Sequence, residues 1–260
     1  MDLSEAGGLA GERHPWERHR FAFYRDVIGR AFGAGSARGA SPERAPIEGG
    51  SPAGAGPLSV LDVGAGDGWF ARELAGAWPS ATEITLWDSG YGDGEAHDDG
   101  FERVREQPEG RFDLVVMIDV AEHVPDDRAF LSNIVQRNVA ADGRVLFAVP
   151  AWPWLWTTHD ERLRHERRYT PRAAKELIAS AGLRIVESGG LFPALLPIRA
   201  AQMARERVLK TPVPGLDGGP QGPVLRAVDA LLSVDRKVAT WASRRGLELP
   251  GLSWWALCAR

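Results

Sequence analysis

The chain has 260 residues, enough for one large α/β domain or two small ones. Its 31 basic and 35 acidic residues give a formal net charge of −4, which disfavours DNA or RNA as a substrate because nucleic-acid binders usually carry a basic excess. The single cysteine, Cys258, excludes an intramolecular disulfide and is expected in the core. No secretory signal and no apolar run of about 18 residues is present, so we expect a cytoplasmic protein without an integral membrane segment.

The N-terminal part predicts one helix followed by a linker. Residues 15–32 carry large apolar side chains at helical spacing, typical of an amphipathic helix. These side chains are Trp16, Phe23, Val27 and Ile28. Residues 33–57 are rich in Gly, Ala, Ser and Pro and hold almost no large apolar group, so they predict a flexible linker. We therefore treat residues 1–57 as one N-terminal unit.

From residue 58 onward, strand patterns alternate with helix patterns. The predicted strands cover residues 58–63, 83–88, 112–118, 143–149, 183–188 and 253–259. The predicted helices cover residues 68–77, 126–140 and 171–181, the second capped by Asp126 or Asp127. The continuous apolar run at 112–118 is typical of a central parallel strand that is covered on both faces. This alternation predicts an α/β fold with a doubly wound sheet.

Residues 191–250 interrupt the alternation and predict a helical insertion. Apolar segments broken by proline come first, and a helix at about 224–244 follows that mixes apolar and basic side chains. We expect this insertion to cover the substrate. Two interpretations of its helix remain open: packing on the sheet with its charges outward, or peripheral contact with a membrane surface that carries a lipid-linked substrate.

A glycine-rich motif, Val-Leu-Asp62-Val-Gly64-Ala65-Gly66-Asp67-Gly68, ends the first predicted strand. Its glycines let the backbone approach a ligand closely, and the following helix presents free N–H groups. A nicotinamide-binding turn has G-x-G-x-x-G under a pyrophosphate, whereas the spacing here is G-x-G-x-G. Carboxylates at Asp62 and Asp67 would repel a pyrophosphate but suit the cationic ammonium of a methionine moiety. A nicotinamide-dependent oxidoreductase remains the alternative.

Two further groups of polar residues follow predicted strands. Asp88, 22 residues after Gly66, can accept hydrogen bonds from the two hydroxyls of a ribose, which both candidate cofactors carry. Asp119, Glu122 and His123 follow the apolar run at 112–118. Ligands of open α/β sheets bind at the carboxyl ends of the strands, so we expect these three side chains to face the ligand crevice.

Two motifs together resemble class I S-adenosylmethionine-dependent methyltransferases of the small-molecule type. VLDVGAGDGWFAREL resembles the glycine-rich first motif of that family, and FDLVVMIDVAEHVPDD resembles its strand-four motif. The resemblance covers residues 58–190, the expected cofactor-binding core, and extends to the terminal strand within 251–260. It implies a Rossmann-like, seven-stranded methyltransferase sheet with an antiparallel last strand, the helical insertion 191–250 before that strand, and the N-terminal helix as a lid.

The resemblance also implies the cofactor and its contacts. S-adenosylmethionine would be the methyl donor, S-adenosylhomocysteine the product and a small molecule the acceptor, methylated at O, N or C. The cofactor-binding residues would be Asp62, Gly64, Ala65, Gly66, Asp67, Gly68, Asp88, Ser89, Ile118, Asp119, Val120 and His123. The Gly/Asp-rich stretch after Asp88 departs from the family, and Glu106 is the nearest candidate for the acid that follows strand three. The sequence does not indicate an oligomeric state.

The segment 150–170, PAWPWLWTTHDERLRHERRYT, follows a predicted strand and supplies the candidate acceptor-side residues. Trp152, Trp154 and Trp156 either wall an apolar acceptor pocket or pack as structural residues. Arg167, Arg168 and Tyr169 either bind an acidic acceptor group or interact with Glu161 and Glu166 on a helix.

Three histidines are the candidate general bases, in the order His159, His123 and His165, because imidazole titrates near the working pH. No cluster has zinc-ligand spacing, so we expect no metal. Besides the oxidoreductase, a non-catalytic protein that only binds the cofactor remains an alternative.

Overall fold

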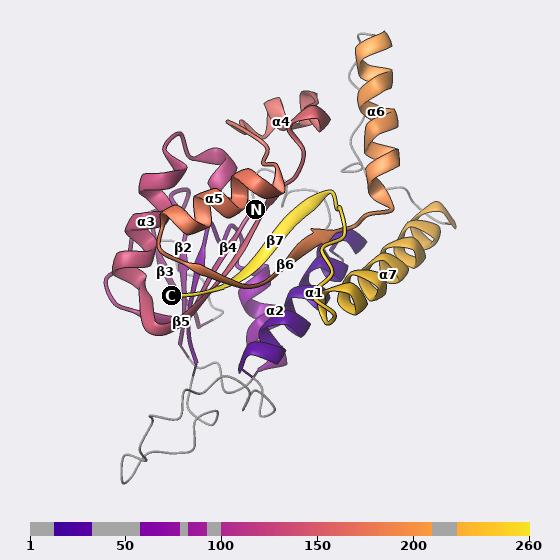
Figure 1. Cartoon of the computed structure of the whole chain (residues 1–260). Coiled ribbons are helices and arrows are strands. Elements are labelled where there is room, and N and C mark those ends of the chain that lie inside the picture. The colour runs from indigo at the N-terminus through magenta and orange to yellow at the C-terminus, as the bar shows by residue number, and fades with distance from the viewer. Residues whose placement is uncertain (1–12, 33–57, 79–82, 93–99, 210–222) are drawn as a thin grey trace.

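A computed structural model describes residues 13–32, 58–78, 83–92, 100–209 and 223–260 of the chain. Within these ranges, one sheet has the strand order β3-β2-β1-β4-β5-β7-β6 (Figure 1). The strands are β1 (Ser59–Val63), β2 (Glu83–Trp87), β3 (Glu102–Val104), β4 (Phe112–Ile118), β5 (Val139–Pro150), β6 (Arg184–Leu191) and β7 (Ser253–Ala259). Strands β1 to β5 pair in parallel, while β7 runs antiparallel to both β5 and β6. The predicted doubly wound sheet with an antiparallel last strand is confirmed.

Helices cover both faces of this sheet, α3 and α5 on one face and α1, α2 and α7 on the other (Figure 1). The longer helices are α1 (Pro15–Phe32), α2 (Trp69–Ala77), α3 (Asp127–Asn138), α4 (Thr158–Arg162), α5 (Pro171–Ser180), α6 (Leu195–Leu209) and α7 (Pro223–Ser243). Two single 3₁₀ turns, η2 (Ala121–His123) and η3 (Pro153–Leu155), follow β4 and β5. Side chains of β4 alternate between the layers, so that Leu114 and Val116 pack with α1 while Val115 and Met117 pack with α3 and α5. The predicted double coverage of this strand is confirmed.

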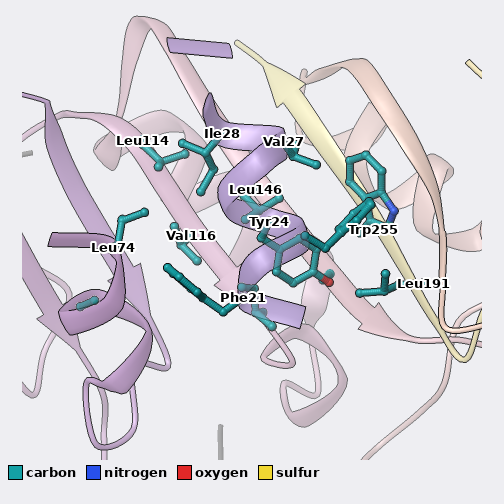
Figure 2. Close-up of a cluster of buried hydrophobic side chains, with 14 of the residues drawn as sticks. Phe21, Tyr24, Val27, Ile28, Leu74, Leu114, Val116, Leu146, Leu191 and Trp255 are labelled. Atoms are coloured by element: carbon teal, nitrogen blue, oxygen red, sulfur yellow. The ribbon is translucent and has the colours of Figure 1, made fainter. Parts of the chain in front are cut away.

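Helix α1 belongs to the core. Its residues Phe23, Tyr24, Val27 and Ile28 are fully buried, and Figure 2 shows Tyr24, Val27 and Ile28 in one cluster with side chains of the sheet strands. Full burial of one large apolar side chain contributes about 1.5–3 kcal/mol, so these contacts hold the helix firmly against the sheet. The expected linker 33–57 lies outside the described residues.

Some element boundaries differ from the sequence-based expectation. Strand β3 has only three residues, too few for an apolar pattern to show, and was not predicted. Helix α3 ends at Asn138 and β5 begins at Val139 without an intervening loop, whereas we expected helix to 140 and strand from 143. The proline-broken segment forms α6, which tolerates Pro197 because that residue lies in the first turn. Among the described helices, none combines the length and the apolar character that a membrane crossing requires.

Candidate active site

The glycine-rich segment forms a tight loop between β1 and α2. Gly64, Gly66 and Gly68 all adopt left-handed backbone angles, with φ of 68°, 57° and 76°. A Cβ atom at Gly64 would lie only 2.6 Å from Cγ2 of Val120, and the Gly64 N–H donates to the carbonyl of Trp87 at 2.7 Å. The loop is therefore held between β2 and the end of β4, and only glycine fits at its first position.

Two carboxylates lie beside this loop. Asp62 on β1 is 5% exposed, and one of its carboxylate oxygens has no hydrogen-bond partner. Burial, together with the nearby charge of Asp88, raises the pKa of Asp62 to about 7. Asp88, directly after β2, accepts the backbone N–H groups of Gly66 at 2.9 Å and Gly90 at 2.8 Å. Asp88 thus fixes the glycine loop, while Asp62 offers a buried carboxylate oxygen that has no hydrogen-bond partner.

Arg20 of α1 and Arg13, which precedes that helix, reach acids at the same edge of the sheet. Arg20, 9% exposed, pairs with Asp119, which follows β4 in a left-handed conformation with φ of 54°. Burial alone would raise the pKa of Asp119, but the charge and hydrogen bond of Arg20, together with other nearby positive charges such as that of His165, lower that pKa overall. Arg13 pairs with Asp67 of the glycine loop. Neither arginine was predicted as a site residue, because a basic residue on or next to an amphipathic helix is usually solvated.

Glu122, His123 and His165 come together next to Asp119. Glu122 is fully buried, and neither of its carboxylate oxygens has a hydrogen-bond partner. Burial and the charge of Asp119 raise the pKa of Glu122 well above its ordinary value. The rings of His123 and His165 meet edge to face, with centroids 4.7 Å apart. One ligand atom from each of the three residues lies within 4.8 Å of the others.

Asp160 organises the segment that carries His165. Its buried carboxylate contacts Nδ1 of His165 at 3.0 Å and accepts from Nε of Arg168 at 2.6 Å and from the Thr157 N–H at 2.9 Å. Burial by itself would raise the pKa of Asp160, but these hydrogen bonds and the charge of Arg168 lower it overall. The Asp160 carboxylate therefore holds the His165 ring in one orientation, and Arg168 and Thr157 in turn hold that carboxylate in place.

Residues 150–170 are bound mainly to one another and to the sheet. Tyr169 is 4% exposed, and its hydroxyl lies 2.7 Å from a carboxylate oxygen of Asp127 and 3.1 Å from the carbonyl of Ala121. Arg167 pairs with Asp127 at 3.0 Å. The arginine ion pairs are therefore formed with Asp127 and Asp160 instead of the expected Glu161 and Glu166.

The three tryptophans have different surroundings. Trp152 donates to the carbonyl of Gly251 at 2.8 Å and packs on the α3/α5 side of the core. Trp154 is half exposed on η3, and Trp156 is partly buried. His159 is partly buried on α4 and is not a member of the Glu122 cluster.

The remaining predicted cofactor-binding residues lie at the ends of β1, β2 and β4. Ala65 is buried in the glycine loop, Ile118 closes β4 beside the partly buried Val120, and Ser89 is exposed after β2. Glu106, the candidate for the acid after strand three, is exposed on the segment that leads from β3 to β4.

Comparison with known proteins gives one family and one fold. A family model described as a methyltransferase domain matches residues 16–188. No curated protein matches the chain. The structure of an S-adenosylmethionine-dependent methyltransferase from Mesorhizobium loti is 16% identical, over 79% of this chain and 92% of that chain, with a TM-score of 0.49. The [4+2]-cyclase SpnF is 14% identical, over 99% and 90% of the two chains, with a TM-score of 0.51. At such identities the structural likeness concerns the fold alone.

Proposed function

We propose, from the premise that the chain belongs to the methyltransferase-domain family whose model matches residues 16–188, that it transfers a methyl group from S-adenosylmethionine to a small-molecule acceptor. S-adenosylhomocysteine would be the second product. The observation that carries the choice of cofactor is Asp62, a buried carboxylate with an unpartnered oxygen beside a loop whose first position only glycine fits.

The residues at the glycine loop suit S-adenosylmethionine. An ammonium group would supply the partner that Asp62 lacks, the loop backbone would line the methionine part, and Asp88 has lone pairs left for ribose hydroxyls. A nicotinamide dinucleotide fits less well, because its pyrophosphate would lie beside Asp62 and Asp88. When bound, S-adenosylmethionine supplies an electrophilic methyl group on a sulfonium.

The imidazoles at the end of β4 are proposed to activate the acceptor. His123 and His165 lie beside Asp119, at the carboxyl edge of the parallel strands where ligands of open α/β sheets bind. Asp160 contacts Nδ1 of His165 and thereby directs Nε2 to the opposite side of the ring. Most of the rate enhancement would come from holding donor and acceptor in line. His159 is not assigned this role, because it lies outside the cluster.

The reaction is tested by incubating the protein with S-adenosylmethionine labelled in its methyl group and a broad panel of small-molecule acceptors. Release of S-adenosylhomocysteine, with label in an acceptor, is the expected result. Tight binding of S-adenosylmethionine with no turnover on any acceptor would favour the non-catalytic alternative. It would also leave room for a different reaction on the same fold, since one structural neighbour is named as a cyclase.

Asp88→Ala is expected to weaken S-adenosylmethionine binding by about 10- to 100-fold, in line with roughly 1.5–3 kcal/mol for hydrogen bonds to a charged group. The variant loses both the ribose acceptor and the carboxylate that holds Gly66. Calorimetric titration measures the change, and Glu73→Ala, an exposed acid of α2, is the matched control. Equal affinities of Asp88→Ala and Glu73→Ala would show that Asp88 does not contact the cofactor.

A lipid-linked acceptor is favoured by one further observation on α7. Val234, Val238 and Trp241 recur at helical spacing and are 58%, 41% and 50% exposed, and the exposed Lys237 and Arg245 flank them. An apolar stripe with basic neighbours suits the surface of an anionic membrane. We expect the protein to sediment with vesicles that contain phosphatidylglycerol and Trp241→Ala to reduce the bound fraction several-fold. Val186→Ala, an exposed apolar residue of β6, is the control, and an equal loss there would contradict this assignment.

A further inference from the structure

We propose that Glu122, His123 and His165 bind one divalent transition-metal cation next to the methyl-transfer site. Their ligand atoms lie within 4.8 Å of one another, so small side-chain rotations would bring all three onto one ion. No metal was predicted, because no cluster with zinc-ligand spacing is present in the sequence; His123 and His165 are 42 positions apart. The role of this ion in catalysis rests on the proposed function, whereas its binding does not.

Glu122 is the first reason to expect a cation. Its side chain is fully buried and neither carboxylate oxygen accepts a hydrogen bond. A buried carboxylate without partners is costly, and buried charges in proteins are normally paired or bound to a metal. A cation held by Glu122 and the two imidazoles would give this carboxylate the partner that the described residues do not provide.

The environment of His165 is the second, independent reason. Metal-bound histidines usually donate their other ring N–H to a carboxylate, which fixes the tautomer and raises the basicity of the coordinating nitrogen. Here Asp160 contacts Nδ1 of His165 at 3.0 Å, and Asp160 is itself held by Arg168. This arrangement leaves Nε2 as the ligand atom, on the side of the ring away from Asp160.

Three hydrogen bonds to backbone carbonyls hold the two ligand-bearing segments together. The Glu166 N–H donates to the carbonyl of Glu122 at 2.7 Å, and Arg167 donates to the carbonyl of Pro125 at 2.8 Å. The hydroxyl of Tyr169 lies 3.1 Å from the carbonyl of Ala121. Each contact joins the η2 turn, or the residues just after it, to the residues just after His165, so the backbone that carries the ligands is held in place and only the side chains need to adjust around an ion.

The ligand chemistry limits both the ion and the acceptor. One carboxylate and two imidazoles favour first-row transition metals such as Mn²⁺, Fe²⁺ or Zn²⁺ over Ca²⁺ and Mg²⁺, which prefer oxygen ligands. With the ion bound, His123 and His165 would activate the acceptor through the ion and not as direct bases. Three protein ligands leave coordination positions for an oxygen of the acceptor, so the acceptor class would be a hydroxyl compound. In the transfer, the acceptor O–H bond breaks and its proton passes to solvent. The O–CH₃ bond forms as the S–CH₃ bond breaks, and the sulfonium becomes a thioether.

The test uses the full chain after removal of metals, titrated with Mn²⁺ and followed by electron paramagnetic resonance of the free ion and by thermal unfolding. The wild type is expected to bind one equivalent and to gain thermal stability. Glu122→Gln and His165→Asn are expected to weaken binding at least tenfold, and His159→Asn, a histidine outside the cluster, is expected to keep it.

Two readouts separate this proposal from misfolding and from the proposed function. Metal-free Glu122→Gln is expected to unfold at or above the temperature of the metal-free wild type, because it loses an unpartnered buried carboxylate. Affinity for S-adenosylmethionine, measured without metal, is expected to stay within about threefold in Glu122→Gln. Wild-type protein that binds neither Mn²⁺ nor Zn²⁺ at millimolar concentration, or a Glu122→Gln variant that binds as well as the wild type, would overturn the metal site.

Discussion

Asp62→Asn is expected to weaken S-adenosylmethionine binding about 100-fold at pH 8 and, at the same pH, to make the cofactor-free protein more stable. Loss of one partner from a buried charge pair typically costs about 2–5 kcal/mol of affinity, which accounts for the first effect. The second effect follows because the asparagine removes a buried carboxylate oxygen that has no hydrogen-bond partner. Calorimetry and urea unfolding measure the two quantities, with Glu73→Gln as an exposed acid-to-amide control.

The raised pKa of Asp62 gives this prediction a pH dependence. Its pKa is about 7 in the folded protein against 3.8 ordinarily, so the folded state holds the additional proton between about pH 4 and pH 7. The stability of the cofactor-free protein should therefore fall as the pH rises through this window. Affinity for the cationic cofactor should rise up to about pH 7, because the proton must leave before Asp62 can pair. Asp62→Asn should lose this dependence, and a variant with the wild-type pH profile would contradict the assignment.

Asp160→Asn is expected to lower the free energy of unfolding by about 3–5 kcal/mol, the usual cost of removing one partner from a buried ion pair. Arg168 would remain 9% exposed without its carboxylate, and Thr157 would lose the side chain that caps α4. Urea unfolding measures the change, and Glu161→Gln, the exposed next residue of α4, is the control.

A second variant checks the physical reason for that loss. Asp160→Asn combined with Arg168→Met removes both charges, so it should recover part of the stability lost in Asp160→Asn. A loss below about 1 kcal/mol for Asp160→Asn alone would mean that this ion pair does not hold the segment in place.

The parts of the fold that were predicted from sequence depend on local patterns. Strand β4 lies at 112–118, as expected, because its apolar run is continuous, and β7 occupies the expected residues 253–259. The cap of α3 was also predicted, since Asp126 accepts from the N–H of Ala129. The glycine loop could be recognised because its glycines and its two acids lie close together in the sequence, between residues 62 and 68.

The contacts that assemble the acceptor side could not be predicted, because they join distant segments. Arg20 meets Asp119 across 99 residues, and neither residue belongs to a pattern that contains the other. The choice among the histidines depended on a turn: Arg164 adopts a left-handed φ of 56°, and the next residue, His165, folds back onto Asp160. Sequence periodicity does not predict such a turn, so His159 and His165 were both candidate bases from the sequence.

The most direct test of the central claim is calorimetric titration of the wild-type protein with S-adenosylmethionine, S-adenosylhomocysteine and a reduced nicotinamide dinucleotide. We expect the first two ligands to bind at micromolar concentration and the third not to bind. Binding of the nicotinamide cofactor without binding of either adenosyl ligand would contradict it, and would assign the glycine loop beside Asp62 to an oxidoreductase.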